Sequence, residues 1–334
     1  MKKIINKPEN IIPELVEGFV SANSRYFEKV LGVNGILYKG RRKDKVTLVI
    51  GGGSGHEPIY SGFIGRGLGD ASVAGNIFAS PDPGAISETA KAAHAGHGIL
   101  FVYGNYAGDN LNFDMAEEIL QDDGVKAAHV RINDDCVSAP VERINDRRGI
   151  AGGVLMVRLA GAACDLGLSL EDTKKQVEHV ADNLRTIGIA VSPGQLPGLD
   201  KPTFELGDDE IEFGMGLHGE PGIKRDKMRP ADELVDVMFS HIVKDMPLKA
   251  GEEVCVLVNG LGATTMLELS IAYRRVKQLL DKAGVLVYDA DVNSYATSQS
   301  MGGFSISILK LDEQIKKLYD NPCFCPFYAK EGKA

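Results

Sequence analysis

Short apolar runs rich in β-branched and aromatic residues recur along the chain, and segments with helical patterning separate most of them. These runs occupy residues 46–50, 98–103, 127–132, 254–258, 285–288 and 304–309. Continuous apolar runs of this length are typical of strands buried on both faces, as in parallel sheets covered by helices. The pattern therefore predicts an α/β fold with mainly parallel sheets that carry helices on both faces.

The chain is predicted to form two α/β domains, because its 334 residues exceed the size of most single domains. Residues 146–185 have a helical pattern. Residues 192–198, with the sequence SPGQLPG, are dense in residues that interrupt helices and strands. We place the boundary just before this segment, which gives domains of residues 1–187 and 188–334.

The charge and composition of the chain exclude some classes of binding partner. A formal net charge of −9 argues against nucleic acid or an anionic membrane surface as the principal partner. No apolar run approaches the roughly 20 residues that span a bilayer, and the first residues lack the apolar segment of a signal peptide. The odd number of cysteines, five, fits reduced thiols better than a disulfide framework. We expect a cytoplasmic protein that binds neither nucleic acid nor membranes and holds no metal.

The segment GGGSGHEP at residues 51–58 directly follows the first apolar run. Glycines between a strand and a predicted helix expose backbone amides, and His56 and Glu57 stand beside them. A P-loop has Lys and then Ser or Thr at these two positions, and the dinucleotide fingerprint needs a glycine three residues after Gly55. Neither motif is present. The segment predicts a small-molecule site, and the alternative is a tight turn whose glycines serve backbone geometry alone.

Two further glycine-containing motifs follow apolar runs: GNYAGD at residues 104–109 and NGLGAT at residues 259–264. Ligands of open α/β sheets bind beyond the carboxyl ends of the strands, which is where these motifs are expected to lie. Asp109 can accept a proton from a substrate hydroxyl there, or it can cap a helix.

A histidine stands between glycines in GMGLHGEPG at residues 214–222. Little side-chain bulk surrounds His218, so a ligand atom can approach its ring nitrogen closely. The alternative is a turn histidine whose ring is hydrogen-bonded. Surface or core positions are expected for the histidines outside these motifs, which are His94, His97, His129, His179 and His241.

In combination, these motifs resemble those of a known family. GGGSGHEP, IFASP at residues 77–81, GNYAGD, GMGLHGEPG and VNGLGAT at residues 258–264 follow the order and approximate spacing seen in the dihydroxyacetone-binding subunit of dihydroxyacetone kinases. The resemblance runs through essentially the whole chain. It implies two α/β domains, a homodimer and a small ketose as substrate.

The resemblance also implies roles for individual residues. In that family the histidine of the HGEPG segment, here His218, holds the ketone covalently as a hemiaminal, which selects carbonyl compounds over glycerol. Asp109 is expected to accept the proton of the terminal hydroxyl as it attacks phosphorus, and His56 to assist at the carbonyl oxygen. Substrate contacts are expected from Gly53, Ser54, Gly55, Ser80 and Gly104.

The phosphoryl donor is expected on another polypeptide, because the chain has no P-loop, no kinase-type catalytic loop and no obvious acidic cluster for magnesium. The family supplies a separate helical subunit with ADP or ATP and Mg²⁺, recharged by exchange with ATP or by a phosphotransferase-system phosphoprotein. Single-chain relatives fuse that helical domain after the ketose-binding part. This chain ends soon after its last predicted strand, which favours the split, multi-subunit type with no cofactor in this chain.

One departure from the family pattern concerns the substrate. Family members commonly have lysine immediately before the Asn-Tyr of the GNYAGD segment, where this chain has Gly104. Dihydroxyacetone remains the first expectation, and a longer ketose such as erythrulose is the alternative. A second alternative is a ketose-sensing regulator of a transcription factor, which needs only His218, whereas His56 and Asp109 together favour an enzyme. A free-standing nucleotide-binding enzyme would require the phosphate loop that is absent.

Overall fold

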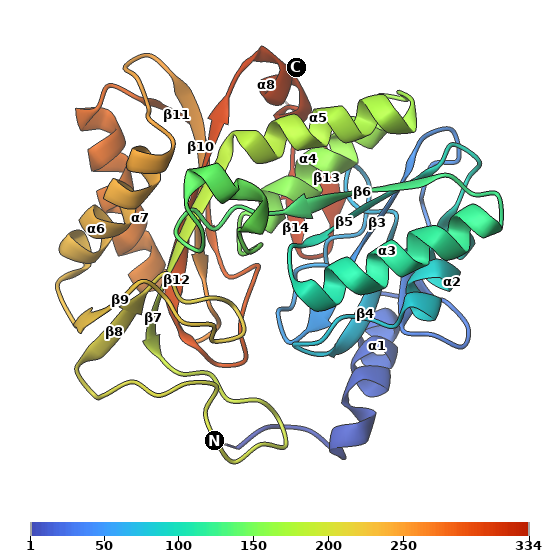
Figure 1. Ribbon diagram of the computed structural model, residues 1–334, viewed down its shortest axis with the longest axis horizontal. Helices are drawn as coiled ribbons and strands as arrows, with labels where there is room; N and C mark the ends of the chain where they lie inside the picture. The colour runs from blue at the N-terminus through green and yellow to red at the C-terminus, as the bar shows by residue number, and fades with distance from the viewer. Residues whose placement is uncertain (1, 333–334) are drawn as a thin grey trace. The chain divides into compact units, whose positions relative to one another are not determined.

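The computed structural model describes residues 2–332, which form two compact units (Figure 1). The first unit comprises residues 2–132, 154–180 and 314–332, and the second comprises residues 133–153 and 181–313. The predicted single boundary at residue 187 differs from this division. Residue 187 lies inside strand β7 (Leu184–Ser192), which pairs along most of its length with β12 (Gly302–Leu311), so a cut there would divide a sheet.

The sheet of the first unit has parallel strands at its centre. Strand β3 pairs in parallel with β4 and β5, β5 pairs in parallel with β6, and β1 and β2 add an antiparallel edge. The order across the sheet is β1 (Phe27–Lys29), β2 (Gly35–Tyr38), β4 (Ala71–Ile77), β3 (Thr47–Ser54), β5 (Ile99–Gly104) and β6 (Ala127–Ile132).

Helices α2 (Pro83–Ala93) and α3 (Ala107–Asp122) pack side by side against this sheet (Figure 1). Their apolar faces, which include Phe113 of α3, join one core with strand residues such as Val49 of β3 and Phe101 of β5. The same unit contains the following further elements: η1 (Pro8–Asn10), α1 (Ile11–Ala22), α4 (Gly153–Asp165), α5 (Leu170–Asp182), α8 (Glu313–Tyr319), β13 (Cys323–Cys325) and β14 (Tyr328–Lys330). Among the described helices, none is both long enough and apolar enough to cross a bilayer.

The predicted continuous helical segment at residues 146–185 is wrong. A short 3₁₀ helix, η2 (Val141–Asp146), precedes it, and the segment itself contains two helices, α4 and α5, followed by the start of strand β7. Gly167 separates the two helices with a φ of 69°, a left-handed conformation that glycine adopts at little cost and that ends an α-helix.

The sheet of the second unit is mixed, and the expectation of mainly parallel strands is wrong here. Within the described residues, only β10 and β11 pair in parallel, and the other neighbours are antiparallel. Only residues 294–301 connect β11 to β12, too few for the crossover that parallel strands require. The order is β11 (Leu286–Asn293), β10 (Glu253–Gly260), β12, β7, β8 (Glu210–Phe213) and β9 (Lys224–Lys227).

One core in the second unit joins this sheet to helices α6 (Ala231–Asp245) and α7 (Met266–Lys282) (Figure 1). Thr265 and Glu268 form a reciprocal capping box at the start of α7, so the helix begins where the NGLGAT motif ends. Both units combine helices with a sheet, which confirms the predicted pair of α/β domains as a fold class.

Candidate functional site

The glycines of the GGGSGHEP segment lie largely within a strand rather than in a loop. Strand β3 continues through Ser54, and turns rather than the predicted helix follow it, since the next helix is α2. A Cβ atom at Gly51 would lie 2.7 Å from the Val73 carbonyl oxygen, and one at Gly53 would lie 2.8 Å from the Ala79 amide nitrogen. The missing side chains therefore let the β4 strand and the segment after it approach β3 closely.

His56 is buried just beyond the end of β3. Its ring stacks on Phe78 with 4.7 Å between the ring centroids. The Gly55 amide donates to both carboxylate oxygens of Glu57 at 3.0 Å, and the Ser54 hydroxyl donates to the Gly75 carbonyl at 2.7 Å. Hydrogen bonds of Ser54 and Gly55, the two residues before His56, therefore fix the turn that carries it.

Asp109 lies in the first turn of α3 and is buried. The N-cap position belongs to Tyr106, so Asp109 is not the helix cap that sequence reasoning left open. A carboxylate in the first turn is stabilised by the positive end of the helix dipole. A Cβ atom at Gly108 would lie 3.6 Å from Cβ of Ser80, so Ser80 lies against the start of this helix.

Tyr60 connects two strand ends of the candidate site, and sequence reasoning did not identify it. A Cβ atom at Gly52 would lie 2.8 Å from the Tyr60 ring, and one at Gly104 would lie 3.3 Å from the Tyr60 hydroxyl and 3.1 Å from the Tyr106 ring. A longer side chain at position 104 would have to displace one of these tyrosines. The carboxyl ends of β3 and β5 thus meet around Tyr60, as expected for a ligand site of a parallel sheet.

His218 lies in the second unit, where Glu220 binds its ring. The distance from His218 Nδ1 to Glu220 Oε1 is 2.7 Å, and the His218 amide donates to Glu220 Oε2 at 3.0 Å. Burial raises the pKa of Glu220, but the hydrogen bond and charge of His218 outweigh it and lower this pKa to about 2. An ionised carboxylate only accepts hydrogen bonds, so Nδ1 carries a proton and, in the neutral ring, Nε2 keeps its lone pair.

The glycines around His218 make room for this carboxylate. A Cβ atom at Gly216 would overlap Glu220 Oε2. Sequence reasoning considered either a ligand-facing ring or a hydrogen-bonded one, and the structure shows a ring that is hydrogen-bonded to Glu220 through Nδ1. The carboxylate two residues after the histidine was the available sequence signal for this partner, and it was not used.

Arg148 and a buried carboxylate support the loop that carries His218. Arg148 Nη2 donates to the Gly214 carbonyl at 2.9 Å, and its Nε donates to Asp135 Oδ2 at 3.1 Å. Burial, opposed by the Arg148 charge, raises the pKa of Asp135 to about 7. These contacts fix the start of the loop relative to the segment at residues 133–153.

The NGLGAT motif packs against the same loop within the second unit. Leu261 belongs to a buried cluster with Met215, Leu217 and Met301. The Asn259 side chain accepts from the amides of residues 295 and 296 at 2.8 and 2.9 Å. Within the second unit the motif therefore has a structural role next to the His218 loop.

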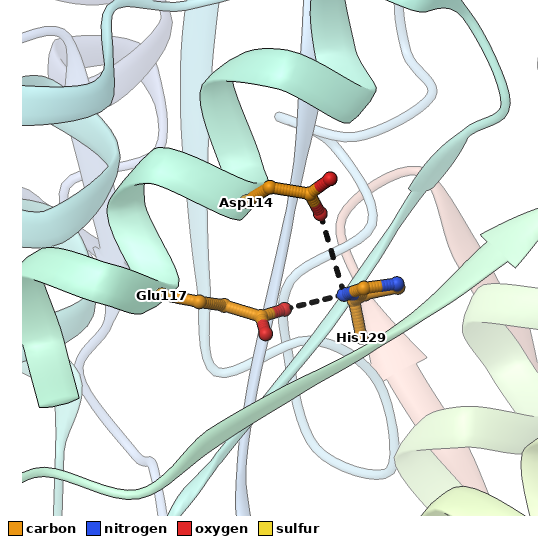
Figure 2. Close-up of side chains that lie close together, drawn as sticks. All are labelled: Asp114, Glu117 and His129. Carbon is orange, nitrogen blue, oxygen red and sulfur yellow. Dashed lines mark hydrogen bonds and ion pairs between the residues drawn. The ribbon is translucent and has the colours of Figure 1, made fainter.

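A cluster of charged residues fixes helix α3 to strand β6, as Figure 2 shows. His129 Nδ1 lies 2.6 Å from Glu117 and 3.6 Å from Asp114. Arg131 donates to both carboxylate oxygens of Asp114 at 3.0 and 2.9 Å, so a cation already balances that carboxylate. The cluster anchors the helix whose first turn carries Asp109, and His129 is half-buried within it.

Residues 17–327 match the Dak1 domain family. A "PTS-dependent dihydroxyacetone kinase 2, dihydroxyacetone-binding subunit DhaK" from Listeria innocua is 40% identical over 330 residues, which cover 98% of this chain and 99% of that protein. An "L-erythrulose kinase" from Pectobacterium atrosepticum is 36% identical over 335 residues, which cover 99% of this chain and 56% of that protein.

Solved structures agree with this likeness. The dihydroxyacetone kinase from C. freundii in complex with AMP-PNP and Mg²⁺ has a TM-score of 0.88 and 27% identity, covering 96% of this chain and 60% of that chain. The dihydroxyacetone kinase operon co-activator DhaQ has a TM-score of 0.89 and 25% identity, covering 96% of this chain and 99% of that chain. The chain therefore belongs to the Dak1 domain family, among the dihydroxyacetone-binding subunits of dihydroxyacetone kinases.

Proposed function

We propose that this chain is the ketose-binding subunit of a dihydroxyacetone kinase. It captures dihydroxyacetone on His218 and presents the terminal hydroxyl for phosphoryl transfer from a separate subunit, which yields dihydroxyacetone phosphate. The observation that carries the proposal is the His218–Glu220 pair at 2.7 Å, in a chain 40% identical along its length to a dihydroxyacetone-binding subunit.

Capture begins with Nε2 of His218 attacking the carbonyl carbon of the ketose. A nitrogen–carbon bond forms, and the π electron pair moves to the carbonyl oxygen, which takes up a proton to give the hemiaminal. Glu220 stabilises the positive charge that develops on the imidazole during attack, because it holds the Nδ1 proton. His56 assists at the carbonyl oxygen as hydrogen-bond donor.

Phosphoryl transfer then uses the terminal hydroxyl of the captured ketose. Asp109 accepts the hydroxyl proton as the oxygen attacks phosphorus, and the phosphorus–oxygen bond to the donor breaks. Asp109 is buried at the start of α3, which supports this role. A shielded carboxylate stays in one position, and water competes less for its hydrogen bonds. The remaining ketose hydroxyls contact the segments with Gly53, Ser54, Gly55, Ser80 and Gly104.

The donor is a separate helical subunit that carries ADP or ATP with Mg²⁺, recharged by a phosphotransferase-system phosphocarrier or by ATP. The Listeria innocua relative that supports this assignment is named as PTS-dependent and matches this chain almost end to end. The C. freundii kinase with AMP-PNP and Mg²⁺ is longer, and this chain matches 60% of it. The proposal includes a homodimer in the cytoplasm, where the buried thiols of the chain remain reduced.

Intact-protein mass spectrometry after incubation with dihydroxyacetone and rapid desalting tests the proposal. Wild type is expected to gain one ketose mass, and His218→Ala is expected to gain none. Asp109→Asn is expected to keep the adduct and to lose turnover when a donor subunit is supplied. An adduct that persists in the His218→Ala variant would refute the assignment of the nucleophile.

Erythrulose is the second candidate substrate, because position 104 is glycine and an L-erythrulose kinase is 36% identical over almost the whole chain. Titration of the adduct with both ketoses compares them directly. Half-saturation at a lower erythrulose concentration would assign the longer ketose, and the opposite order would assign dihydroxyacetone.

A ketose-sensing regulator is the candidate from another functional class, since the DhaQ co-activator matches 96% of this chain with a TM-score of 0.89. His218 capture alone suffices for sensing. Turnover of captured ketose with a donor subunit distinguishes the two, because a sensor forms the adduct and releases no phosphorylated product.

A further inference from the structure

Two glycines on neighbouring strands of the first unit leave room for one tyrosine ring. The parallel pairing of β3 and β5 extends to Gly51, and Gly52 and Gly104 are the next residues of the two strands. Residues at the same level of paired parallel strands point to the same face of the sheet. A Cβ atom at Gly52 would lie 2.8 Å from the Tyr60 ring, and one at Gly104 would lie 3.3 Å from the Tyr60 hydroxyl. The Tyr60 side chain therefore reaches from β3 to β5 at their carboxyl ends.

Neither glycine is required by its backbone conformation. Left-handed φ values are the ones that favour glycine, and neither Gly52 nor Gly104 has one. Glycine weakens the interior of a strand, and it often marks a place where a ligand or another part of the chain approaches closely. The atoms nearest to the two missing Cβ atoms belong to Tyr60 and Tyr106. The two glycines are therefore explained by the tyrosine side chains that they accommodate.

Tyr60 has an unusual backbone conformation. Its φ of 63° lies in the left-handed region, which costs free energy for a residue that has a Cβ atom. Residues in such conformations persist where the surrounding structure fixes them, and they cluster at ligand sites and active sites. The Phe63 amide donates to the Tyr60 carbonyl at 2.9 Å, and the Gly62 amide donates to the Pro58 carbonyl at 2.8 Å. The position of the Tyr60 ring is thus built into the turn that follows His56.

The same contacts show what fills the space beside Gly104. A Cβ atom at this position would lie 3.1 Å from the Tyr106 ring, in addition to its contact with the Tyr60 hydroxyl. This distance is shorter than the roughly 3.5–4.0 Å of an optimal contact between nonbonded carbon atoms. Two tyrosine side chains thus occupy the volume that a side chain at position 104 would need. Glycine at this position does not by itself enlarge the site for a longer ketose.

We propose that Tyr60 determines which ketose the site accepts, by closing it to ketoses longer than three carbons. This role rests on the proposed function, in which the ketose contacts Gly53 and Gly104. Tyr60 lies against Gly104 and against Gly52, the residue before Gly53, so a ketose that contacts both segments meets the tyrosine. Erythrulose has one carbon more than dihydroxyacetone, and its extra CHOH group competes with the Tyr60 side chain for the same volume.

Titration of the adduct with dihydroxyacetone and with erythrulose, followed by intact-protein mass spectrometry, tests the proposal. Wild type is expected to reach half-saturation at the lower concentration with dihydroxyacetone. In Tyr60→Ala, the ratio of the half-saturating erythrulose concentration to that of dihydroxyacetone is expected to fall roughly tenfold or more, because one carbon group in a closed pocket changes affinity by this order. Tyr60→Phe keeps the ring and removes only the hydroxyl, so it should lower the ratio by a smaller factor.

Tyr26→Ala is the matched control. Tyr26 is also half-buried in the first unit, and its ring lies against Phe27 and Phe324. This variant is expected to keep the wild-type ratio. Thermal unfolding followed by circular dichroism verifies that each variant is folded, and if Tyr60→Ala does not fold, the ratio in Tyr60→Phe decides.

The ratio separates a role in specificity from a general loosening of the site, which weakens both adducts alike. A lower ratio in the Tyr60 variants, with the wild-type ratio kept in Tyr26→Ala, supports the role of Tyr60. An unchanged ratio in the folded Tyr60 variants, an equal fall in the control, or a wild type that prefers erythrulose overturns this role and leaves the proposed function intact. Absence of an adduct with either ketose in wild type refutes the proposed function and the role of Tyr60 with it.

Discussion

At the scale of single residues, the hydrogen-bond partner of His218 sets the protonation of its Nδ1 atom, which matters for the proposed role of His218 as nucleophile. The Glu220 carboxylate holds both Nδ1 and the backbone amide of His218. Replacing Glu220 by glutamine keeps the shape and removes the charge, and the amide can present its NH₂ group to Nδ1. We expect Glu220→Gln to raise the dihydroxyacetone concentration for half-maximal adduct by about tenfold, since charge-assisted hydrogen bonds are the stronger ones. Mass spectrometry of the adduct measures this, with Glu205→Gln in an exposed neighbouring loop as control.

The depressed pKa of Glu220 gives a stability prediction with a definite sign. Its carboxylate contributes to stability above its ordinary pKa of 4.5, and this contribution is lost as pH falls toward about 2. Wild type should therefore exceed Glu220→Gln in free energy of unfolding near neutral pH, on the order of 1–2 kcal/mol after allowance for solvent screening. Urea unfolding at pH values from 7 to about 2 measures the difference. A difference that stays constant across this range would contradict the assignment.

At the scale of elements, glycines set how closely helices approach their neighbours. A Cβ atom at Gly161 in α4 would lie 2.5 Å from the Gly67 carbonyl oxygen and 2.6 Å from Leu68 Cα. Both obstacles are backbone, which cannot rotate away. We expect Gly161→Ala to lower the free energy of unfolding by about 3 kcal/mol, as overpacked substitutions do.

Gly18 provides the matched control in the same unit. It lies within α1 and is exposed, and a Cβ atom added there would meet nothing within 4 Å. Gly18→Ala should raise the free energy of unfolding by about 0.5–1 kcal/mol, because alanine loses less backbone entropy in a helix than glycine. Equal effects of the two substitutions would show that close packing at Gly161 does not matter.

At the scale of the whole molecule, one ion-pair network connects residues 133–153 to the rest of the second unit. Asp245 at the end of α6 accepts from Arg147 at 2.8 and 2.6 Å and from Arg185 of β7 at 2.5 Å. The Arg147 side chain is 0% exposed. The network thus connects three segments that are distant in the sequence.

Asp245→Asn should lower the free energy of unfolding by about 3–5 kcal/mol, because it leaves two largely buried guanidinium groups without their carboxylate. Asp236→Asn, on the same helix, breaks a more exposed pair with Arg275 and should cost less than about 1 kcal/mol. Chemical denaturation of both variants compares them, and similar losses would contradict the importance of burial.

Local patterns in the sequence were sufficient to predict most of the strands and the family of the protein. All six apolar runs form strands, because apolar runs rich in β-branched residues favour extended structure. Their burial was not predicted equally well, since β11 lies at an edge of its sheet and is only partly buried. Motifs around His56, Asp109 and His218 led to the family because spacing along the chain is itself sequence information. The prediction of two α/β units rested on the length of the chain and on the alternation of predicted strands and helices.

Tertiary structure alone decided how these parts combine. The antiparallel pairing of β12 and the interleaved composition of the two units depend on hydrogen bonds and ion pairs between distant segments, which no local pattern records. The same holds for Tyr60 between two strand ends and for Arg148 beneath the His218 loop. The motifs that identify the family were thus readable in the sequence, whereas the contacts that hold His56, Asp109 and His218 in place arise only when folding brings remote residues together.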